Sequence, residues 1–346
     1  MDQALHTPST RDGSPHEAGG VQAHVCSGVL TLPRALPLYH GGQLSEPRLA
    51  WRLAGRPDAP VVAALGGISA HRRVFDVAQP RAGWWWEVVG PGGALDSEQV
   101  RVLGIDYLGG SGESTAPLPG QPFPSLSSYD QAEALRALLD HLRIERLRGF
   151  VGASYGGMVA LAFAERHPTR VERLVVISAA DRPHPLATAW RSVQRRIVRF
   201  AASLGHASEG LELARALAMA TYRTPGEFAA RFGQGPRSVD GAYIFPIEEY
   251  LFARGRDYAG RYRPESFLCL SESIDLHTVD ATRIPVPAAV VAVREDQLVP
   301  LEDLRALAAK LPQATLHELS SSHGHDAFLK EAGALQPIFR SLYGVV

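Results

Sequence analysis

A serine stands between two glycines in the run Gly152-Ala153-Ser154-Tyr155-Gly156. A short apolar run precedes it and a stretch of helical character follows it, so the pattern predicts a strand that turns sharply into a helix. Such a nucleophile elbow needs glycines because strand and helix crowd together, and it exposes the hydroxyl of the central serine. Ser154 is therefore the candidate nucleophile of an acyl-transfer or hydrolytic reaction.

A serine hydroxyl is a weak nucleophile at neutral pH, so this interpretation requires a base and a group that orients the base. In folds with this elbow, the acid and then the histidine follow the serine along the chain. Asp296 and His325 each come just past the carboxyl end of a predicted strand, the edge where such sheets build their sites. Their neighbours Glu295 and His323 are the alternatives, and Asp296 and His325 are favoured.

Acyl chemistry also needs hydrogen-bond donors for the oxyanion that forms on the attacked carbonyl. We expect one donor to be the backbone N–H of Tyr155, directly after the nucleophile, and the second to come from the Gly66-Gly67 loop. The sequence does not decide which of the two glycines supplies it, and a simple tight turn is the alternative reading of the pair. Losing one such donor typically costs about 3 kcal/mol of transition-state stabilisation.

Short apolar runs of the buried-strand type alternate with helical patterns along most of the chain. The predicted strands cover residues 48–53, 61–65, 100–105, 148–152, 173–178, 287–293 and 314–319. The helical patterns between them include residues 129–142, 158–166 and 302–310. This alternation predicts the α/β class, with a mostly parallel sheet covered by helices on both faces.

The alternation stops in the third quarter of the chain, where helical segments such as residues 189–204 take over. We therefore predict a helical insertion, or lid, at residues 181–284, carried by a core formed from residues 25–180 and 285–346. The first residues are polar and rich in Gly, Pro, Ser and His. We expect residues 1–24 to form a disordered tail.

Composition narrows the classes of function. The formal net charge of −1 over 346 residues argues against nucleic acid or an anionic membrane as the main partner. Cys26 and Cys269 are too few for a disulfide framework, which favours a reducing compartment. No run approaches eighteen apolar residues and the first twenty lack an apolar core, so we expect neither a membrane span nor a secretory signal. We also find no metal-ligand spacing, dinucleotide loop or P-loop, and expect no metal or prosthetic group.

Beyond these motifs, the chain resembles the homoserine O-acyltransferases of the α/β-hydrolase superfamily over most of its length. The resemblance rests on Ser69-Ala70-His71, Gly83-Trp84-Trp85, Gly90-Pro91-Gly92 with Ala94-Leu95-Asp96, Leu108-Gly109-Gly110 with Gly112, Ser114 and Thr115, Ser154-Tyr155-Gly156-Gly157-Met158, Val193-Gln194-Arg195, Glu249-Tyr250-Leu251 and Gly324-His325-Asp326-Ala327-Phe328-Leu329. It implies an α/β-hydrolase fold with a helical lid and a triad of Ser154, Asp296 and His325. It also implies a cytoplasmic homodimer made through lid helices.

Members of the family that this chain resembles move an acyl group from a coenzyme A thioester to the serine and then to the hydroxyl of homoserine, opening methionine biosynthesis. The resemblance implies acetyl-CoA or succinyl-CoA as co-substrate. It also implies that Arg195 binds the carboxylate of the amino acid acceptor and that Asp326 binds its ammonium group. A solvated helix face is the alternative role for Arg195, and a helix cap is the alternative for Asp326.

Several departures from the family pattern concern the insertion. Arg261-Tyr262-Arg263-Pro264-Glu265-Ser266 replaces a usual Arg-Phe-Asp segment, and the usual Asp-Pro and Gly-Tyr segment after the arginine is missing. Tyr155 stands where methionine is frequent, and Ser111 where cysteine is frequent. The first two departures leave the acceptor and the acyl donor open, whereas none of them disables the triad.

Four alternatives therefore remain open. A succinyl donor would need a cation near the acyl pocket, which Arg72 or Arg73 could supply, although both could bind phosphate or stay solvated. Serine could replace homoserine as acceptor, since one methylene discriminates by only about 1–3 kcal/mol. An esterase or thioesterase would use water as acceptor with an identical triad, and a non-catalytic binding protein would not depend on Ser154.

Overall fold

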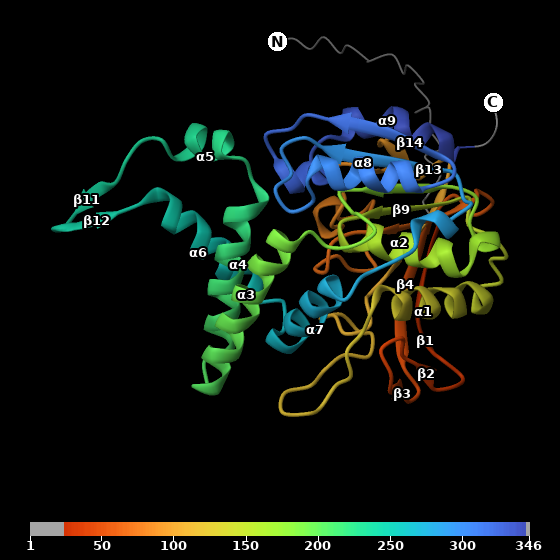
Figure 1. Ribbon diagram of the computed structural model, residues 1–346, viewed down its shortest axis with the longest axis horizontal. Coiled ribbons are helices and arrows are strands. Elements are labelled where there is room, and N and C mark those ends of the chain that lie inside the picture. Colours follow the sequence, from red (N-terminus) through yellow and green to blue (C-terminus); the bar gives the residue numbers. More distant parts are fainter. Residues whose placement is uncertain (1–23, 344–346) are drawn as a thin grey trace, which may run out of the picture.

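A central sheet of eight strands organises residues 24–343, the part of the chain that this computed structural model describes (Figure 1). In spatial order the strands are β1 (His24–Thr31), β4 (Arg48–Gly55), β8 (Arg101–Ile105), β5 (Val61–Leu65), β9 (Gly149–Ala153), β10 (Leu174–Ile177), β13 (Ala288–Val293) and β14 (Ala314–Leu319). β4 runs antiparallel to both of its neighbours, and all pairs from β8 to β14 are parallel. The predicted mostly parallel sheet is confirmed.

The central strands are apolar throughout because both of their faces are covered. All residues of β9 and β10 are buried. Leu65 of β5 pairs with Gly152 of β9, and Ala153 pairs with Ile177 of β10. This register makes the loops that follow β5 and β9 emerge side by side at the carboxyl edge of the sheet.

Helices cover both faces of the sheet, as predicted. One face packs against α1 (Ser128–His141), α2 (Tyr155–Arg166) and α8 (Leu301–Lys310), and the other packs against α9 (Ala332–Phe339) and the loop that contains Trp85. Alternate residues of each strand belong to the two cores, as the pleat requires. Helix α1 begins with a capping box in which Ser127 and Asp130 satisfy each other's backbone N–H groups.

Between β10 and β13 the chain leaves the sheet and forms a mainly helical insertion (Figure 1). Its elements are α3 (Pro185–Ser203), α4 (Ala207–Tyr222), α5 (Pro225–Phe232), β11 (Arg237–Val239), β12 (Ala242–Ile244), α6 (Pro246–Ala259) and α7 (Pro264–Asp275). Their buried side chains form a separate small core of Val198, Leu211, Ala214, Tyr258, Tyr262 and Phe267. The α5–β12 arm extends away from the rest of the molecule.

Some elements were not anticipated from the sequence. β1 and the hairpin β11–β12 were missed, and His24, which was assigned to the tail, begins β1; residues 1–23 lie outside the described part of the chain. Short elements complete the fold: β2 (Leu36–Pro37), β3 (Gln43–Leu44), β6 (Val89–Gly90), β7 (Leu95–Asp96) and the 3-10 turns Pro80–Ala82, Pro168–Arg170, Ala281–Arg283, Gly324–Leu329 and Arg340–Leu342.

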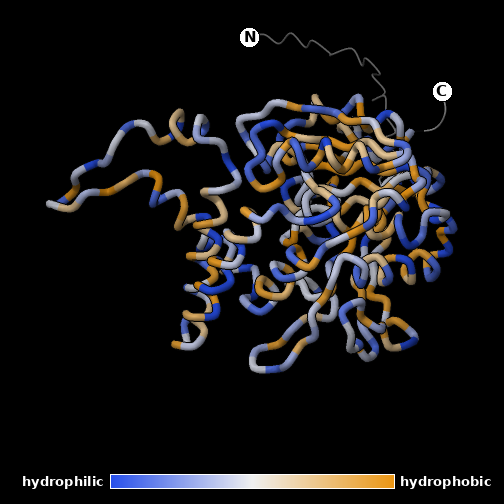
Figure 2. Tube along the Cα trace, viewed as in Figure 1, coloured by the Kyte–Doolittle hydropathy of each residue, from blue (hydrophilic) through white to orange (hydrophobic). Residues whose placement is uncertain are grey.

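Hydropathy follows this architecture. Hydrophobic residues gather along the strands of the sheet, whereas hydrophobic and hydrophilic residues alternate along the helices of the insertion (Figure 2). Among the helices of residues 24–343, none combines the length and the apolar character that crossing a bilayer would require.

Candidate active site

Ser154 sits at the turn between β9 and α2 with a backbone φ of 54° and ψ of −123°, a conformation that residues with side chains rarely adopt. The flanking glycines are required by space. A Cβ on Gly152 would lie 2.2 Å from the carbonyl oxygen of Gly156, and a Cβ on Gly156 would lie 2.2 Å from that of Leu65. The strand–turn–helix geometry of a nucleophile elbow is therefore present.

The structure brings the side chains of Ser154, His325 and Asp296 into one hydrogen-bonded chain. The Nε2 atom of His325 lies 2.9 Å from Ser154 Oγ, and its Nδ1 atom lies 2.7 Å from Asp296 Oδ2. The second carboxylate oxygen of Asp296 accepts hydrogen bonds from the backbone N–H groups of Leu298 (2.9 Å) and Val299 (3.1 Å). The arrangement can take a proton from the serine hydroxyl.

The electrostatics of His325 suit a base. Burial disfavours the protonated imidazole, but the negative charge and hydrogen bond of Asp296 outweigh it and raise the pKa of His325 above its ordinary value. Asp296 is fully buried, so its charge acts on the imidazole with little screening by water.

Glu295 and His323, the alternatives to Asp296 and His325, form hydrogen bonds with other partners. Glu295 accepts hydrogen bonds from Ser320 Oγ (2.5 Å) and from the backbone N–H of Ser321 (2.8 Å), so it holds the loop that leads to the histidine. The Nδ1 atom of His323 accepts a hydrogen bond from Arg223 at 2.8 Å. Neither side chain takes part in the hydrogen-bonded chain that ends at Ser154.

The loop after β5 borders the nucleophile. A Cβ built on Gly67 would lie 4.0 Å from Ser154 Oγ, and one on Gly66 would collide with the ring of Trp84 at 2.7 Å. The carbonyl of Gly66 accepts hydrogen bonds from the Tyr107 hydroxyl (2.7 Å) and the Gly156 N–H (2.9 Å). These contacts fix the loop beside the first turn of α2, whose N–H groups have no acceptor within the helix. The oxyanion roles of Tyr155, Gly66 and Gly67 stay predictions.

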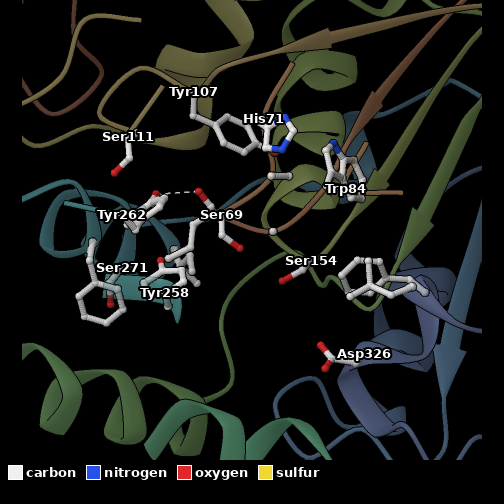
Figure 3. Close-up of a pocket in the computed structure, with 18 of the residues that line it drawn as sticks. Ser69, His71, Trp84, Tyr107, Ser111, Ser154, Tyr258, Tyr262, Ser271 and Asp326 are labelled. Atoms are coloured by element: carbon white, nitrogen blue, oxygen red, sulfur yellow. Dashed lines mark hydrogen bonds between the residues drawn. The ribbon is translucent and has the colours of Figure 1, made fainter. Parts of the chain in front are cut away.

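Ser154 opens onto a pocket of about 1180 Å³ whose walls come from the sheet edge and from the insertion. Figure 3 shows Tyr258, Tyr262 and Ser271 of the insertion across from Ser154, with Asp326 beside the catalytic edge. Tyr262 donates a hydrogen bond to the carbonyl oxygen of Ile68 at 2.7 Å, which ties the insertion to the loop after β5.

Arg195 and Asp326, the two expected acceptor-binding residues, differ in position. Asp326 lines the pocket, where its carboxylate accepts a hydrogen bond from Arg223 at 3.1 Å. Arg195 lies behind the wall: it donates to Asp275 (2.5 Å) and to the backbone carbonyl and hydroxyl of Ser271, which itself lines the pocket. The structure therefore brings only Asp326 to the cavity of Ser154.

Sequence reasoning missed Arg215 of α4. Its partly buried guanidinium lines the pocket between the rings of Tyr222 (5.1 Å) and Tyr258 (4.8 Å). Within residues 24–343 no carboxylate forms a salt bridge with it, although the charge of Asp326 is among the influences that raise its pKa against the effect of burial. One arginine inside an amphipathic helix looks solvent-exposed in sequence, so no local signal marks it.

Arg72 and Arg73, the two arginines considered for a succinyl donor, differ in their carboxylate partners. Arg72 is engaged by Asp106 (2.7 Å) and Glu113 (2.6 Å), whereas the nearest carboxylate to Arg73 is that of Asp76 at 3.7 Å. Both line the pocket, and Arg73 has the more exposed side chain.

Comparison with known proteins agrees with this architecture. A family described as alpha/beta hydrolase fold matches residues 78–332. A homoserine O-succinyltransferase of Xanthomonas campestris is 47% identical over 88% of this chain and 80% of its own length. A homoserine O-acetyltransferase of Thermus thermophilus is 36% identical over 86% of both chains. A serine O-succinyltransferase of Litchfieldella anticariensis is 32% identical over 89% of this chain and 96% of its own.

Solved structures share the fold at lower identity. Esterase E22, as an L374D mutant, superposes with a TM-score of 0.83 at 20% identity, covering 93% of this chain and all of that one. Homoserine O-acetyltransferase from Bacillus anthracis superposes with a TM-score of 0.81 at 17% identity, covering 92% and 97%. The chain therefore belongs to the alpha/beta hydrolase fold family and, within it, to the homoserine O-acyltransferases.

Proposed function

We propose that this protein moves an acyl group from a coenzyme A thioester to the side-chain hydroxyl of L-homoserine, through an ester on Ser154, as a step of methionine biosynthesis. The observation that carries the proposal is the Ser154–His325–Asp296 chain of hydrogen bonds, which opens into a pocket walled by the insertion. The 47% identity to a homoserine O-succinyltransferase supports the same reaction.

In the first half-reaction Ser154 Oγ attacks the thioester carbonyl while its proton passes to Nε2 of His325. Asp296 holds the imidazole in place and stabilises its positive charge. The oxyanion accepts hydrogen bonds from the N–H of Tyr155 and from the loop of Gly66 and Gly67. When the intermediate collapses, the carbon–sulfur bond breaks, His325 returns the proton to the departing thiolate, and the acyl group stays on Ser154.

In the second half-reaction the hydroxyl of homoserine gives its proton to His325 and attacks the ester carbonyl. Collapse of this second intermediate breaks the bond to Ser154 Oγ, which takes the proton back from His325. The acyl group leaves as an ester of homoserine, and the enzyme returns to its starting state. The same base thus serves both steps without any group outside the triad changing its charge.

The acceptor needs a cation for its carboxylate and an anion for its ammonium group. Arg215 supplies the cation in this proposal, in place of Arg195, because it lines the pocket without a carboxylate partner among residues 24–343. Asp326 supplies the anion: one of its oxygens contacts Arg223, which leaves the other oxygen for the ligand. Both side chains lie in the same pocket as Ser154.

Exclusion of water favours transfer over hydrolysis. Tyr258 and Tyr262 of the insertion are buried and line the pocket across from the nucleophile. Burial raises the pKa of both hydroxyls far above their ordinary value, so they stay neutral there. We infer that the insertion acts as a lid over the acyl-enzyme.

The donor in this proposal is succinyl coenzyme A, because the 47% identical relative is a succinyltransferase. The relative at 36% identity is named as an acetyltransferase, and the relative at 32% identity is named as a serine acyltransferase. Acetyl coenzyme A and L-serine are therefore the competing substrates to test.

Two copies associate through α3 in this proposal, within the cytoplasm. Large apolar side chains recur along that helix and just after it: Leu186, Val193, Phe200 and Leu204 are each at least 50% exposed. Val193, Ile197 and Phe200 line a shallow apolar hollow on it. Light scattering on the wild type and on Phe200→Asp tests the dimer, which the variant should weaken.

The decisive experiment is a thiol-release assay in which purified protein receives acetyl or succinyl coenzyme A with homoserine, serine or no acceptor. Release that depends on homoserine and on one donor supports the proposal and names the acyl group. Release at the same rate without an acceptor contradicts it, because water then takes the acyl group and the protein is a thioesterase.

A further inference from the structure

The pocket carries more positive charge than the proposed acceptor needs. Eight arginines line it against three carboxylates, those of Asp106, Glu113 and Asp326. A single amino acid with one carboxylate requires one cation. An excess of this size in a cleft attracts ligands that carry several negative charges.

Three of these arginines are already neutralised by close carboxylates. Arg72 is held by Asp106 and Glu113, Arg191 lies 2.6 Å from Asp275, and Arg52 lies 3.1 Å from Asp76. These pairs are tight enough to fix the arginines as parts of the wall.

Three exposed arginines that line the pocket keep their charge available. Arg73 has only a 3.7 Å contact with Asp76, a carboxylate that is already closer to Arg52. Arg81 and Arg261 are exposed and form no salt bridge with any carboxylate of residues 24–343. Arg261 comes from the insertion and the other two come from the core, so the two regions meet here.

His71 reports how closely these charges lie. Partial burial lowers the pKa of His71, and although Asp106 opposes this, the charges of Arg73, Arg261 and Arg72 lower the pKa further. The backbone N–H of Arg73 donates a hydrogen bond to His71 Nδ1 at 3.2 Å, and the N–H of Trp84 donates one to the carbonyl oxygen of Arg73 at 3.2 Å, so Arg73 lies between His71 and Trp84. We call Arg73, Arg81 and Arg261 the cationic rim; within residues 24–343 their one salt-bridge contact is that of Arg73 with Asp76 at 3.7 Å.

Aromatic surface adjoins this rim. The ring of Trp86 is 43% exposed and lies 5.9 Å from the guanidinium of Arg81. The Nε1 atom of Trp84 is buried and has no hydrogen-bond partner in the part of the chain that the structure describes. Figure 3 places Trp84 and His71 together on the side of the pocket away from Asp326. A flat ring beside cations is the surface on which a purine base stacks.

We propose that Arg73, Arg261 and Arg81 bind the phosphate groups of the coenzyme A donor and that Trp86 stacks against its adenine ring. The inference rests on the proposed function and names the part of the same pocket that holds the tail of the donor. The acceptor then occupies the inner end, near Arg215 and Asp326, while the nucleotide stays at the rim. Charge-assisted contacts to phosphate are the strongest hydrogen bonds available to arginine.

Steady-state kinetics with three thioesters of one acyl group test the assignment: the coenzyme A, dephospho-coenzyme A and pantetheine forms. We compare the wild type with Arg73→Gln, Arg261→Gln and the double variant. The matched control is Arg56→Gln, an exposed arginine that does not line the pocket. Each single change should raise KM for the coenzyme A form about tenfold, and the double change roughly a hundredfold, since each removes one charged hydrogen bond.

The pantetheine thioester separates this inference from the proposed function. It should react with homoserine at the same rate in all variants, because it lacks the phosphates. If the wild type has the same KM for the pantetheine and the coenzyme A thioesters, the rim site is wrong, whereas the transfer reaction is unaffected. If the wild type does not transfer the acyl group of the coenzyme A form to homoserine, the proposed function is wrong, and the effect of the variants on thiol release still tests the rim.

Calorimetry with adenosine 3′,5′-bisphosphate gives a readout that does not depend on activity. The wild type should bind it, Arg56→Gln should bind it equally, and the double variant should bind at least about tenfold more weakly. Trp86→Ala should weaken binding severalfold through lost stacking. Equal binding by the wild type and the double variant, or no binding by the wild type, overturns the inference.

Discussion

The carboxyl edge of the sheet and the helical insertion contribute to the same pocket by different physical means. Ser154, Asp296 and His325 follow strands whose positions are set by a ladder of backbone hydrogen bonds and by two large cores. The insertion has its own core of six buried residues and carries Arg215, Tyr258 and Tyr262. In the proposed reaction the triad therefore belongs to the sheet, whereas Arg215 and the two tyrosines belong to the insertion.

The two regions are joined by packing and by hydrogen bonds, since Leu270 of α7 is buried in the core of the sheet. Tyr262 contacts the carbonyl of Ile68, Arg223 contacts Asp326, and Thr224 donates a hydrogen bond to the carbonyl of Ser322 at 2.9 Å. The insertion therefore holds both the loop after β5 and the loop that carries His325. Changes on either side should have separable effects.

The largest effect should come from the sheet edge. Ser154→Ala removes the nucleophile, so thiol release with and without acceptor should fall by roughly 10⁴-fold or more. Unfolding followed by circular dichroism should show a stability equal to or above that of the wild type. Transfer that survives in Ser154→Ala would mean that the acyl group never resides on this residue.

Asp296→Asn should lower kcat by roughly 10³- to 10⁴-fold, because the amide holds the imidazole in the wrong tautomer. The pH profile provides a second readout. Neutral His325 is the active form, and its raised pKa places the acid limb of kcat/KM above about 6.5. The limb should move to lower pH in the variant. Glu295→Gln is the matched control and should retain most of the activity.

Arg215→Gln tests the insertion. Loss of the acceptor's carboxylate contact should reduce transfer to homoserine about a hundredfold, while the burst of thiol that marks acyl-enzyme formation stays intact. The same change at Arg195 should affect the two half-reactions equally, because that residue supports the wall through Ser271 and Asp275. A larger loss of transfer in the Arg195 variant would restore the assignment based on family resemblance.

His277 tests the seam between the regions. It follows α7 and contacts Ser128 Oγ (2.7 Å) and the carbonyl of Ala180 (3.1 Å). Burial lowers the pKa of His277 to about 4. Below pH 6.5 this imidazole therefore binds a proton in the unfolded state but stays neutral in the folded state. Between pH 6.5 and 4 this should cost about 2–3 kcal/mol of unfolding free energy. Urea unfolding of His277→Gln should show a shallower pH dependence.

Tyr262→Phe should have the smallest effect. It removes one hydroxyl from the contact with Ile68 and leaves the packing of the ring unchanged, so kcat should fall about fivefold with little change in KM. The loss should appear in both half-reactions, since each forms an oxyanion beside this loop. A change confined to the homoserine step would place Tyr262 at the acceptor instead.

Sequence patterns predicted the sheet well because its strands are uniformly apolar and their order fixes where loops emerge. The contact between Ser154 and His325 followed from that order alone, although the residues are far apart in the chain. β1 was missed because its residues alternate between exposed and half-buried positions, which leaves no apolar run. The hairpin β11–β12 was missed because its strands are three residues long and almost fully exposed.

Within the site, the limits of prediction lie in the insertion. Arg195 fits the resemblance, yet its guanidinium pairs with Asp275, a contact between α3 and α7 that no local pattern encodes. Arg215 reaches the pocket because α4 turns this face inward between two tyrosines. Long side chains on helices are placed by tertiary packing, so their partners emerge only when the helices are assembled.

The interruption of the sheet between β10 and β13 also has a consequence for biosynthesis of the chain. Leu174 pairs with Ala288, so more than a hundred further residues must be synthesised after β10 before its neighbour β13 exists. During that time β10, with its buried sequence Leu-Val-Val-Ile, is an open edge that can pair with other chains. Asp296 and His325 arrive only with the last strands. The nascent protein therefore gains His325 only after β13 has closed this edge.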